Sequence, residues 1–315
     1  MSFETLLGNE RLKQNLSESL AKKHISHFYL ISGPKGSGKH TLAKLLAAAI
    51  LCQGHRKPCL SCVPCRKVME GNHPDFITVE DPEHKNVAVK IVRQFREDVF
   101  IRPNESDYKL YLFPQELGLE GQNALLKILE EPPRYGVFIL LTDNPDKLLP
   151  TVRSRCTELK LLPLEEGMLK KQLRMDFPQA EEEDLAAAIF RSGGFLGQAR
   201  ELLQIGDQLP PQTESFVKAF AAKDPLLLTQ TLVPMEKWKR DALAEILASW
   251  TELLESALSS RSGLRAVSPH ARALAQQRTA AELFDALKEL KKALEYTQSN
   301  VSPAAVCGYL VWALR

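Results

Sequence analysis

The stretch that most constrains the fold runs from Phe28 to Thr41, FYLISGPKGSGKHT. Its first four residues are apolar and predict a short buried strand, and Ser32-Gly33-Pro34 indicates a turn. The segment from Thr41 to Leu51 predicts a helix. A strand, a glycine-rich turn and a helix in this order are the context in which a phosphate-binding loop is expected.

Each part of this loop has a distinct chemical task. Three glycines let the backbone approach a phosphate closely, and the following helix directs its N–H groups and positive dipole end to the same place. These glycines are Gly33, Gly36 and Gly38. Lys39 supplies the charge for the outer phosphates, but His40 stands where the pattern requires a Ser or Thr to bind Mg²⁺, and Thr41 comes one residue late. We expect a phosphate cradle with an impaired metal ligand; the alternative is a purely structural strand-to-helix turn.

Size and composition place the chain among globular proteins of two or three domains. It has 315 residues, of which 44% are apolar and 25% charged. The net charge of +2 does not favour a protein that holds nucleic acid by bulk charge, although a local basic patch remains open. The first residues lack the pattern of a secretory signal, and no apolar run approaches the roughly 20 residues that span a bilayer. We expect a cytoplasmic protein without a membrane partner.

Four of the six cysteines lie close together, with the spacing C-x6-C-x2-C-x2-C. They are Cys52, Cys59, Cys62 and Cys65. In a reducing compartment such a cluster is typical of a structural Zn²⁺ site, because C-x2-C pairs bring thiolates together on tight turns. Reduced structural thiols and a redox role are the alternatives. The isolated Cys156 and Cys307 are interpreted as packing residues.

Strand and helix signals alternate over the first half of the chain. The other strands are expected at Asp75–Val79, Lys109–Phe113, Val137–Leu141 and Glu158–Leu162. This alternation predicts a parallel sheet with helices on both faces. After residue 163 the strand signals stop, and helical patterns at Glu165–Met175, Glu181–Arg191 and Gly197–Leu203 predict a small helical domain. We expect three domains, at residues 1–163, 164–207 and 208–315, with Gly206–Pro211 as a linker before the last helices.

Several motifs together resemble the AAA+ ATPases, and more closely the clamp-loader subunits of bacterial DNA polymerase III. The stretch from Gln122 to Pro133, QNALLKILEEPP, is similar to a signature of those subunits, and Ser154-Arg155-Cys156 resembles their SRC motif. The cysteine cluster also occurs in that family, although the first gap is shorter here. Asn300–Pro303 resembles its asparagine-rich turn before the last helix. The resemblance implies an AAA+ domain, a helical lid and a helical collar.

The chain departs from an active member of this family at the nucleotide site. Active subunits end the third strand in Asp-Glu, which hold Mg²⁺ and orient water, whereas this chain has Pro114-Gln115. Glu116 follows in a different register and is a weak alternative. Gly197 stands where the lid of an active subunit presents an arginine, while Thr142 matches the polar position after the fourth strand that senses γ-phosphate. We therefore expect no intrinsic ATPase and no Mg²⁺, and leave ATP or ADP binding open.

The resemblance also implies roles for partners and for one arginine. Arg155 of the SRC motif is expected to act as an arginine finger on the nucleotide of a neighbouring subunit, and the alternative is an ion pair within its own domain. The expected partners are the delta subunit and the gamma/tau ATPase subunits in a hetero-pentamer, the sliding clamp and primer-template DNA. Two rival interpretations are a catalytically active ATPase subunit of the same machine or a related motor, and a zinc-stabilised nucleic-acid binder.

Overall fold

A computed structural model describes residues 3–84, 86–204, 209–262, 269–299 and 301–314. By their contacts these residues form two compact units, Met1–Leu169 with Gly194–Gln198, and Lys170–Gly193 with Ala199–Arg315. The first three linker residues, 206–208, and Asn300 of the late turn lie outside the described residues. The predicted division into three domains stays a prediction.

The first unit is built on a parallel sheet of five strands in the order β2-β3-β4-β1-β5. The strands are β1 (Phe28–Ser32), β2 (Phe76–Thr78), β3 (Lys109–Phe113), β4 (Gly136–Thr142) and β5 (Thr157–Lys160). In the central pair, Ser32 of β1 lies in register with Thr142 of β4. The residues that follow these two strands therefore meet at the same edge of the sheet.

Alternate residues of each central strand enter opposite cores. In β1, Tyr29 and Ile31 pack into one core, whereas Phe28 and Leu30 pack into the other. Side chains of a strand point alternately to its two faces, so a strand covered on both faces must be apolar throughout. All residues of β1, β3 and β4 are buried, which confirms the predicted sheet with helices on both faces.

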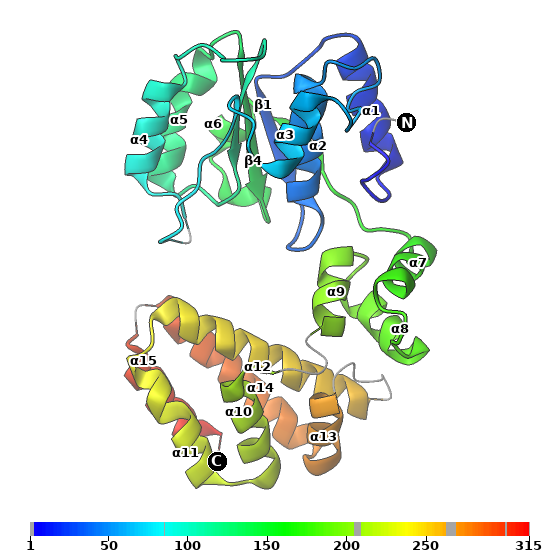
Figure 1. Cartoon of the computed structure of the whole chain (residues 1–315). Coiled ribbons are helices and arrows are strands. Elements are labelled where there is room, and N and C mark those ends of the chain that lie inside the picture. The colour runs from blue at the N-terminus through cyan, green and yellow to red at the C-terminus, as the bar shows by residue number, and fades with distance from the viewer. Residues whose placement is uncertain (1–2, 85, 205–208, 263–268, 300, 315) are drawn as a thin grey trace. The chain divides into compact units, whose positions relative to one another are not determined.

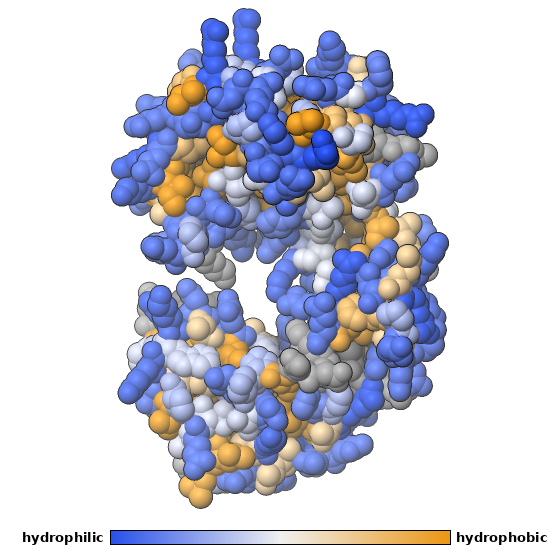
Figure 2. Space-filling view, in the orientation of Figure 1, coloured by the Kyte–Doolittle hydropathy of each residue, from blue (hydrophilic) through white to orange (hydrophobic). Residues whose placement is uncertain are grey.

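Helices cover both faces of this sheet (Figure 1). One core includes residues of α1, α2 and α3, and the other includes residues of α4, α5 and α6. The bounds are α1 (Glu10–Ala21), α2 (Lys39–Leu51), α3 (Val63–Glu70), α4 (Val89–Asp98), α5 (Leu119–Glu130), the 3-10 helix η1 (Pro145–Lys147) and α6 (Pro150–Arg153). The face of this unit seen in Figure 2 is mainly hydrophilic, with separate apolar residues between.

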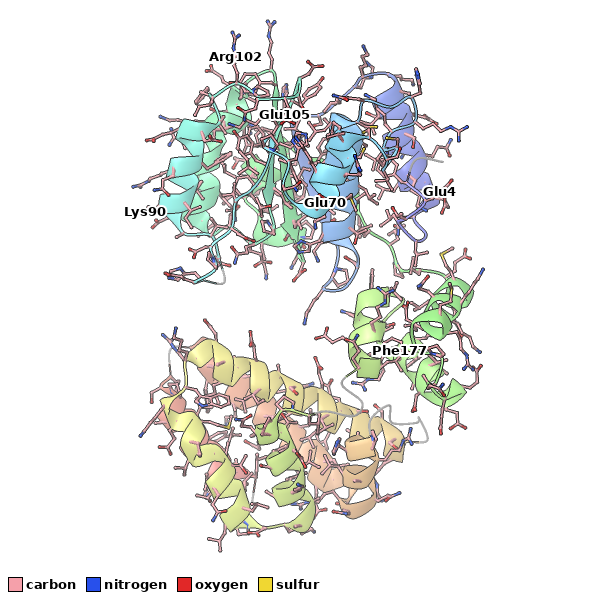
Figure 3. All side chains as sticks on the ribbon, in the orientation of Figure 1. Glu4, Glu70, Lys90, Arg102, Glu105 and Phe177 are labelled. Atoms are coloured by element: carbon pink, nitrogen blue, oxygen red, sulfur yellow. The ribbon has the colours of Figure 1, made fainter. Side chains whose placement is uncertain are left out.

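The predicted elements are present, with bounds that differ by a few residues. The helix expected from Thr41 begins at Lys39, because Gly38 adopts a left-handed backbone conformation and ends the loop. The second strand is shorter than predicted. Before it, the buried carboxylate of Asp75 accepts hydrogen bonds from the backbone N–H groups of Asn104 (2.6 Å) and Glu105 (2.8 Å). Figure 3 labels Glu105 in the first unit. The Asp75 side chain therefore holds the loop before β3, and β2 begins one residue later, at Phe76.

All the regular secondary structure among the described residues of the second unit is helical. Its helices are α7 (Glu166–Asp176, from Lys170 on), α8 (Glu182–Arg191), α9 (Leu196–Gln204, from Ala199 on), α10 (Pro211–Ala222), α11 (Pro225–Leu232), the 3-10 helix η2 (Val233–Lys237), α12 (Arg240–Arg261), α13 (Pro269–Gln277), α14 (Ala280–Gln298) and α15 (Pro303–Ala313). Helices α10 to α15 share one apolar core, in which Trp250 stacks on Phe216 with ring centroids 4.1 Å apart. No helix among the described residues has the length and apolar composition needed to cross a membrane.

Candidate functional site: a phosphate-type loop and a four-cysteine cluster

The glycine-rich loop lies between β1 and α2 at the carboxyl edge of the sheet. Gly36 and Gly38 have φ angles of 77° and 95°, which other residues rarely adopt. The backbone N–H of Gly33 donates to Thr142 O at 3.2 Å and ties the start of the loop to the end of β4. The sequence thus folds into the strand, turn and helix predicted for a phosphate-binding loop.

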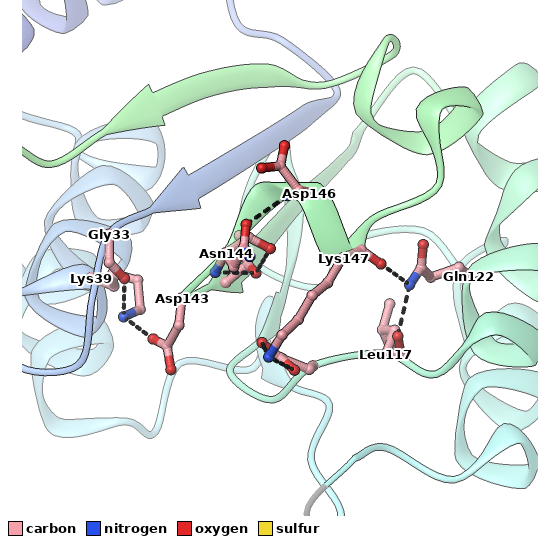
Figure 4. A network of polar contacts seen from close by, with 10 residues as sticks. Gly33, Lys39, Leu117, Gln122, Asp143, Asn144, Asp146 and Lys147 are labelled. Atoms are coloured by element: carbon pink, nitrogen blue, oxygen red, sulfur yellow. Dashed lines mark hydrogen bonds and ion pairs between the residues drawn. The ribbon is translucent and has the colours of Figure 1, made fainter. Parts of the chain in front are cut away.

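Lys39 lies in the first turn of α2 and is almost completely buried. Its Nζ donates to Gly33 O at 2.7 Å, to Pro34 O at 3.0 Å and to Asp143 Oδ1 at 2.6 Å. Figure 4 shows the ammonium between Gly33 and Asp143. Because an ammonium has three N–H donors, these contacts occupy all of them.

Other groups of the loop keep hydrogen-bonding capacity that suits an anion. The Oγ of Ser37 is buried and has no partner among the described residues. The first N–H groups of α2 have no carbonyl one turn earlier within the helix, as at every helix N-terminus. The loop therefore retains donors that fit a phosphate group, while its lysine is engaged by the chain itself.

The residues expected near a metal offer little to Mg²⁺. Partial desolvation, together with the charges of Lys39 and Lys44, lowers the pKa of His40 below its ordinary value and favours the neutral imidazole. A neutral imidazole is a poor ligand for Mg²⁺, which prefers oxygen. Thr41 is exposed in the first turn of α2, and Pro114 at the end of β3 has no side-chain ligand. These positions do not fit a magnesium site.

Gln115 is held by a neighbouring loop. Its Nε2 donates to the carbonyl groups of Asp81 and His84, both at 2.9 Å, and its Oε1 accepts from Asp81 N at 2.7 Å. Glu116 pairs with Lys147, whose Nζ lies 3.0 Å from both carboxylate oxygens. Each side chain therefore has a structural partner, and the amide of Gln115 has no carboxylate with which to take a proton from water.

The loop also contacts the start of α9, where the resemblance expects an arginine in active subunits. The N–H of Gly197 donates to Gly36 O at 2.9 Å. A Cβ atom added to Gly36 would lie 2.5 Å from Gln198 N, and one added to Gly197 would lie 2.6 Å from the Cα of Gly36. Both positions therefore require glycine in this arrangement.

Thr142 ends β4 and is buried. Its Oγ1 donates to Asn144 O at 2.9 Å and accepts from Asn144 N at 3.2 Å. The hydroxyl thus stabilises the turn that follows β4. Thr142 lies next to the loop, and its side-chain hydrogen bonds belong to that turn. Its expected role at a γ-phosphate stays a prediction.

The four clustered cysteines converge at the other end of α2. Their Sγ atoms all lie within 4.8 Å of one another. Cys52 follows the last residue of α2, and Cys65 lies in α3, so packing between these two helices positions half of the cluster. Cys59 and Cys62 come from the loop between them. The predicted set of residues is therefore assembled in one place.

The surroundings of this cluster suit a bound cation. Backbone N–H groups of Gly54, Cys59 and Cys62 point at cluster sulfur atoms at 3.3 to 3.4 Å. Hydrogen bonds from Ser61 lower the pKa of Cys59 to about 5, whereas burial raises the pKa of Cys52 and Cys65. Buried thiols lose their protons when a metal compensates the charge, and four close sulfurs match tetrahedral Zn²⁺. The cluster fits a structural zinc ion.

Arg155 lies in the turn between α6 and β5 and is exposed. Its NH1 donates to Thr151 O at 2.9 Å, and its NH2 lies 3.5 Å from Glu130 Oε1. Arg153 is held more firmly, at 2.8 Å from Asp146 and 3.4 Å from Glu158. An exposed pair at 3.5 Å contributes little free energy, so Arg155 can exchange Glu130 for another anion at small cost.

Residues 8–165, which include the loop, the cluster and Arg155, match the family described as DNA polymerase III, delta subunit. This match covers 158 of the 315 residues. The chain belongs to this family. Among proteins of DNA polymerase III, it is 32% identical to subunit tau of Bacillus subtilis over 233 residues and 35% identical to subunit delta' of the same species over 166 residues. These matches cover 72% and 52% of this chain.

The similarity to known DNA polymerase III proteins is partial in length. The chain spans 40% of the Bacillus subtilis tau subunit and 50% of the delta' subunit. Among solved structures, a gamma subunit-related protein of Thermotoga maritima has a TM-score of 0.52 at 16% identity, and the match covers 96% of this chain and 99% of that one. At this identity the likeness concerns the fold alone, a parallel sheet covered by helices and followed by further helices.

The sequence reasoning assigned no contact to two residues of this DNA polymerase III family member. Asp143 contacts the loop lysine, and its signal was an acidic residue directly after a buried strand. Gln122 is buried in α5; it donates to Leu117 O at 2.8 Å and accepts from Leu149 N at 2.7 Å. Its signal was a polar residue on the inward face of an apolar helix. Gln122 thereby ties α5 to the segment that leads to Arg155.

Proposed function

We propose that this chain is the delta-prime subunit of a DNA polymerase III clamp loader, a subunit that does not hydrolyse ATP. It assembles with the delta subunit and the gamma/tau ATPase subunits in a hetero-pentamer and helps load the sliding clamp onto primed DNA. The observation that carries this proposal is the state of the nucleotide site. Pro114 replaces the metal-binding acid, and Gln115 replaces the catalytic acid and is engaged by the loop at Asp81.

In this proposal Arg155 acts on the nucleotide of the neighbouring subunit. It is exposed, and within its own domain it has one hydrogen bond to Thr151 O and a weak pair with Glu130, so its guanidinium can turn to another subunit at small cost. A guanidinium near a γ-phosphate stabilises the negative charge that develops during phosphoryl transfer. Such a role explains why a chain without a working site of its own belongs in an ATP-driven assembly. Zn²⁺ at the cysteine cluster has a structural role, because four thiolates leave no open position.

The main alternative is a working ATPase subunit, which is favoured by the similarity to tau and gamma subunits. The two functions are separated by an ATPase assay on the purified chain. We expect no turnover above background. A rate of about 1 s⁻¹ or more that is lost in Lys39→Ala would support the ATPase subunit instead.

Assembly and the role of Arg155 are tested in the reconstituted complex. The purified chain is mixed with the delta and gamma/tau subunits of the same species, and a stoichiometric complex is expected. Arg155→Ala should assemble normally, because it removes one exposed side chain. DNA-stimulated ATP hydrolysis at the adjacent subunit should fall by about 1,000-fold, the lower end of the effect known for single arginine fingers.

Arg153→Ala is the matched control, because it removes an exposed arginine from the same segment. We expect it to leave hydrolysis within about twofold of the wild type. If Arg155→Ala assembles and hydrolyses ATP as the wild type does, Arg155 is not the finger. If the wild-type chain enters no complex with the other subunits, the proposed function itself is wrong.

A further inference from the structure

The ion pair between Lys39 and Asp143 brings together two residues that are far apart in the chain. Its Nζ–Oδ1 distance is 2.6 Å, and the side chains of Lys39 and Asp143 are 9% and 58% exposed. The lysine is therefore enclosed, while the carboxylate that contacts it is accessible from solvent. Two carbonyl oxygens complete the shell of the ammonium, so the aspartate provides its one negatively charged partner among the described residues.

The topology of the sheet explains why this particular residue reaches the lysine. β1 and β4 are neighbours, and Ser32 and Thr142 lie in register at their ends. Asp143 is the first residue beyond β4, beside Gly33, the first residue of the loop beyond β1. A short acidic side chain at this position lies within reach of the ammonium (Figure 4).

The carboxylate of Asp143 occupies the kind of position that an anionic ligand of the loop would take. In a phosphate-binding loop the lysine contacts the outer phosphates of the nucleotide. A polyphosphate that approaches Lys39 must displace Asp143 or lie next to its negative charge, and like charges in close contact oppose binding. The other open donors, such as the Oγ of Ser37, do not carry this conflict.

We propose that Asp143 is an internal anion that holds the lysine of the phosphate-type loop and keeps its affinity for nucleoside triphosphates low. The loop has the backbone conformation and the hydrogen-bond donors of a phosphate-binding loop, and the negative charge of Asp143 lowers its affinity for the nucleotide. This inference goes beyond the proposed function, because it concerns the loop of this chain and not the nucleotide of a neighbour. It requires no clamp-loader partner and is tested on the chain alone.

The test is ATP binding to the full-length chain, measured by calorimetry in buffer without magnesium and without a chelator that would remove zinc. Asp143→Asn removes the charge and keeps the size, and it should bind ATP at least about tenfold more tightly than the wild type. Asp146→Asn is the matched control. It removes the same charge three residues away, from a side chain that pairs with Arg153 at 2.8 Å, and should leave the affinity within about twofold.

The double variant Lys39→Met with Asp143→Asn tests whether the gain passes through the lysine. We expect the gain to be lost. The proposal is overturned if Asp143→Asn binds ATP no more tightly than Asp146→Asn, or if the gain persists without Lys39. Thermal unfolding of each variant accompanies the assay; should Asp143→Asn fail to fold, Asp143→Ser removes the same charge and is measured in its place against the same criteria.

Discussion

The two ends of helix α2 carry two sites of opposite character. At its N-terminus the loop lysine is surrounded by acceptors of the same chain, and Gly36 is in backbone contact with Gly197. At its C-terminus four thiols converge within 4.8 Å, and burial raises the pKa of two of them. The first site has its charge compensated from within, whereas the thiolate form of the second requires a cation from outside.

This difference indicates which of the two sites depends on a ligand for stability. Groups that are satisfied within the chain keep their structure without a ligand, and a ligand must compete with the internal partners. Buried thiolates without a cation are unfavourable, so metal binding contributes directly to folding. We therefore expect the cysteine end of α2 to require its ligand and the loop end to be stable without one.

The largest expected effect concerns the cysteine cluster. Protein purified without added metal should contain about one zinc ion per chain, and Cys65→Ser should lose it. Because metal binding and folding are coupled, the variant should lose on the order of 3 to 10 kcal/mol of unfolding free energy in the first unit. Zinc affinity should fall as the pH is lowered, because protons compete with the metal for the thiolates. Elemental analysis and thermal unfolding measure these effects.

Cys156→Ser is the control for this experiment. Cys156 is a half-buried thiol whose Sγ lies 3.3 Å from Val152 O, outside the cluster. The variant should keep its zinc. The prediction is wrong if the folded protein contains no metal and all four clustered cysteines react with an alkylating agent. The two ends of α2 would then not differ in their need for a ligand.

A smaller effect is expected from adding a Cβ atom at Gly36, where the loop contacts the start of α9. Gly36→Ala adds a Cβ 2.5 Å from Gln198 N at a φ of 77°, so it suffers both a collision and backbone strain. We expect a loss of about 2 to 4 kcal/mol. Gly71→Ala is the control, because its φ is 80° but nothing lies within 4 Å of the added atom. It should lose only about 1 to 2 kcal/mol, from strain alone.

Urea unfolding of both variants measures this difference in unfolding free energy. Equal losses in Gly36→Ala and Gly71→Ala would mean that the contact with Gly197 is absent in solution. The loop end of α2 would then be less enclosed than its geometry indicates.

The smallest effect is expected for an exposed ion pair near the cysteine end of α2. Lys67 of α3 lies 2.7 Å from Glu105, and the two side chains are 32% and 48% exposed. Glu105→Gln should cost at most about 1 kcal/mol, because solvent screens such pairs. Glu70 lies in α3 with Lys67, and Glu70→Gln is the control for the loss of a surface charge. The lysine of the pair with Glu105 is 32% exposed, whereas Lys39 in its pair with Asp143 is 9% exposed, at a similar distance. A loss of unfolding free energy clearly above about 1 kcal/mol for Glu105→Gln would mean that distance, and not burial, decides the strength of these pairs.

Much of the fold and part of the site could be predicted from the sequence. The loop glycines, Lys39 and the four cysteines are close in the chain, so local spacing reveals the structures that they form. The apolar strands and their order along the chain also predicted a parallel sheet. The bounds were less accurate where a single residue changes the local geometry, as Gly38 does at the start of α2.

The sequence by itself determined which residues could form a phosphate-type loop, a metal cluster and a site without catalytic acids, because each depends on residue identity at short spacing. The tertiary structure alone decided how these residues are used. Asp143 and Lys39 are 104 residues apart, and Gln115 and Asp81 are 34 apart. Such contacts depend on strand order and on the path of each loop, since a parallel sheet brings the carboxyl ends of distant strands to one edge. The compensation of the loop lysine by its own chain is therefore a property of the folded molecule.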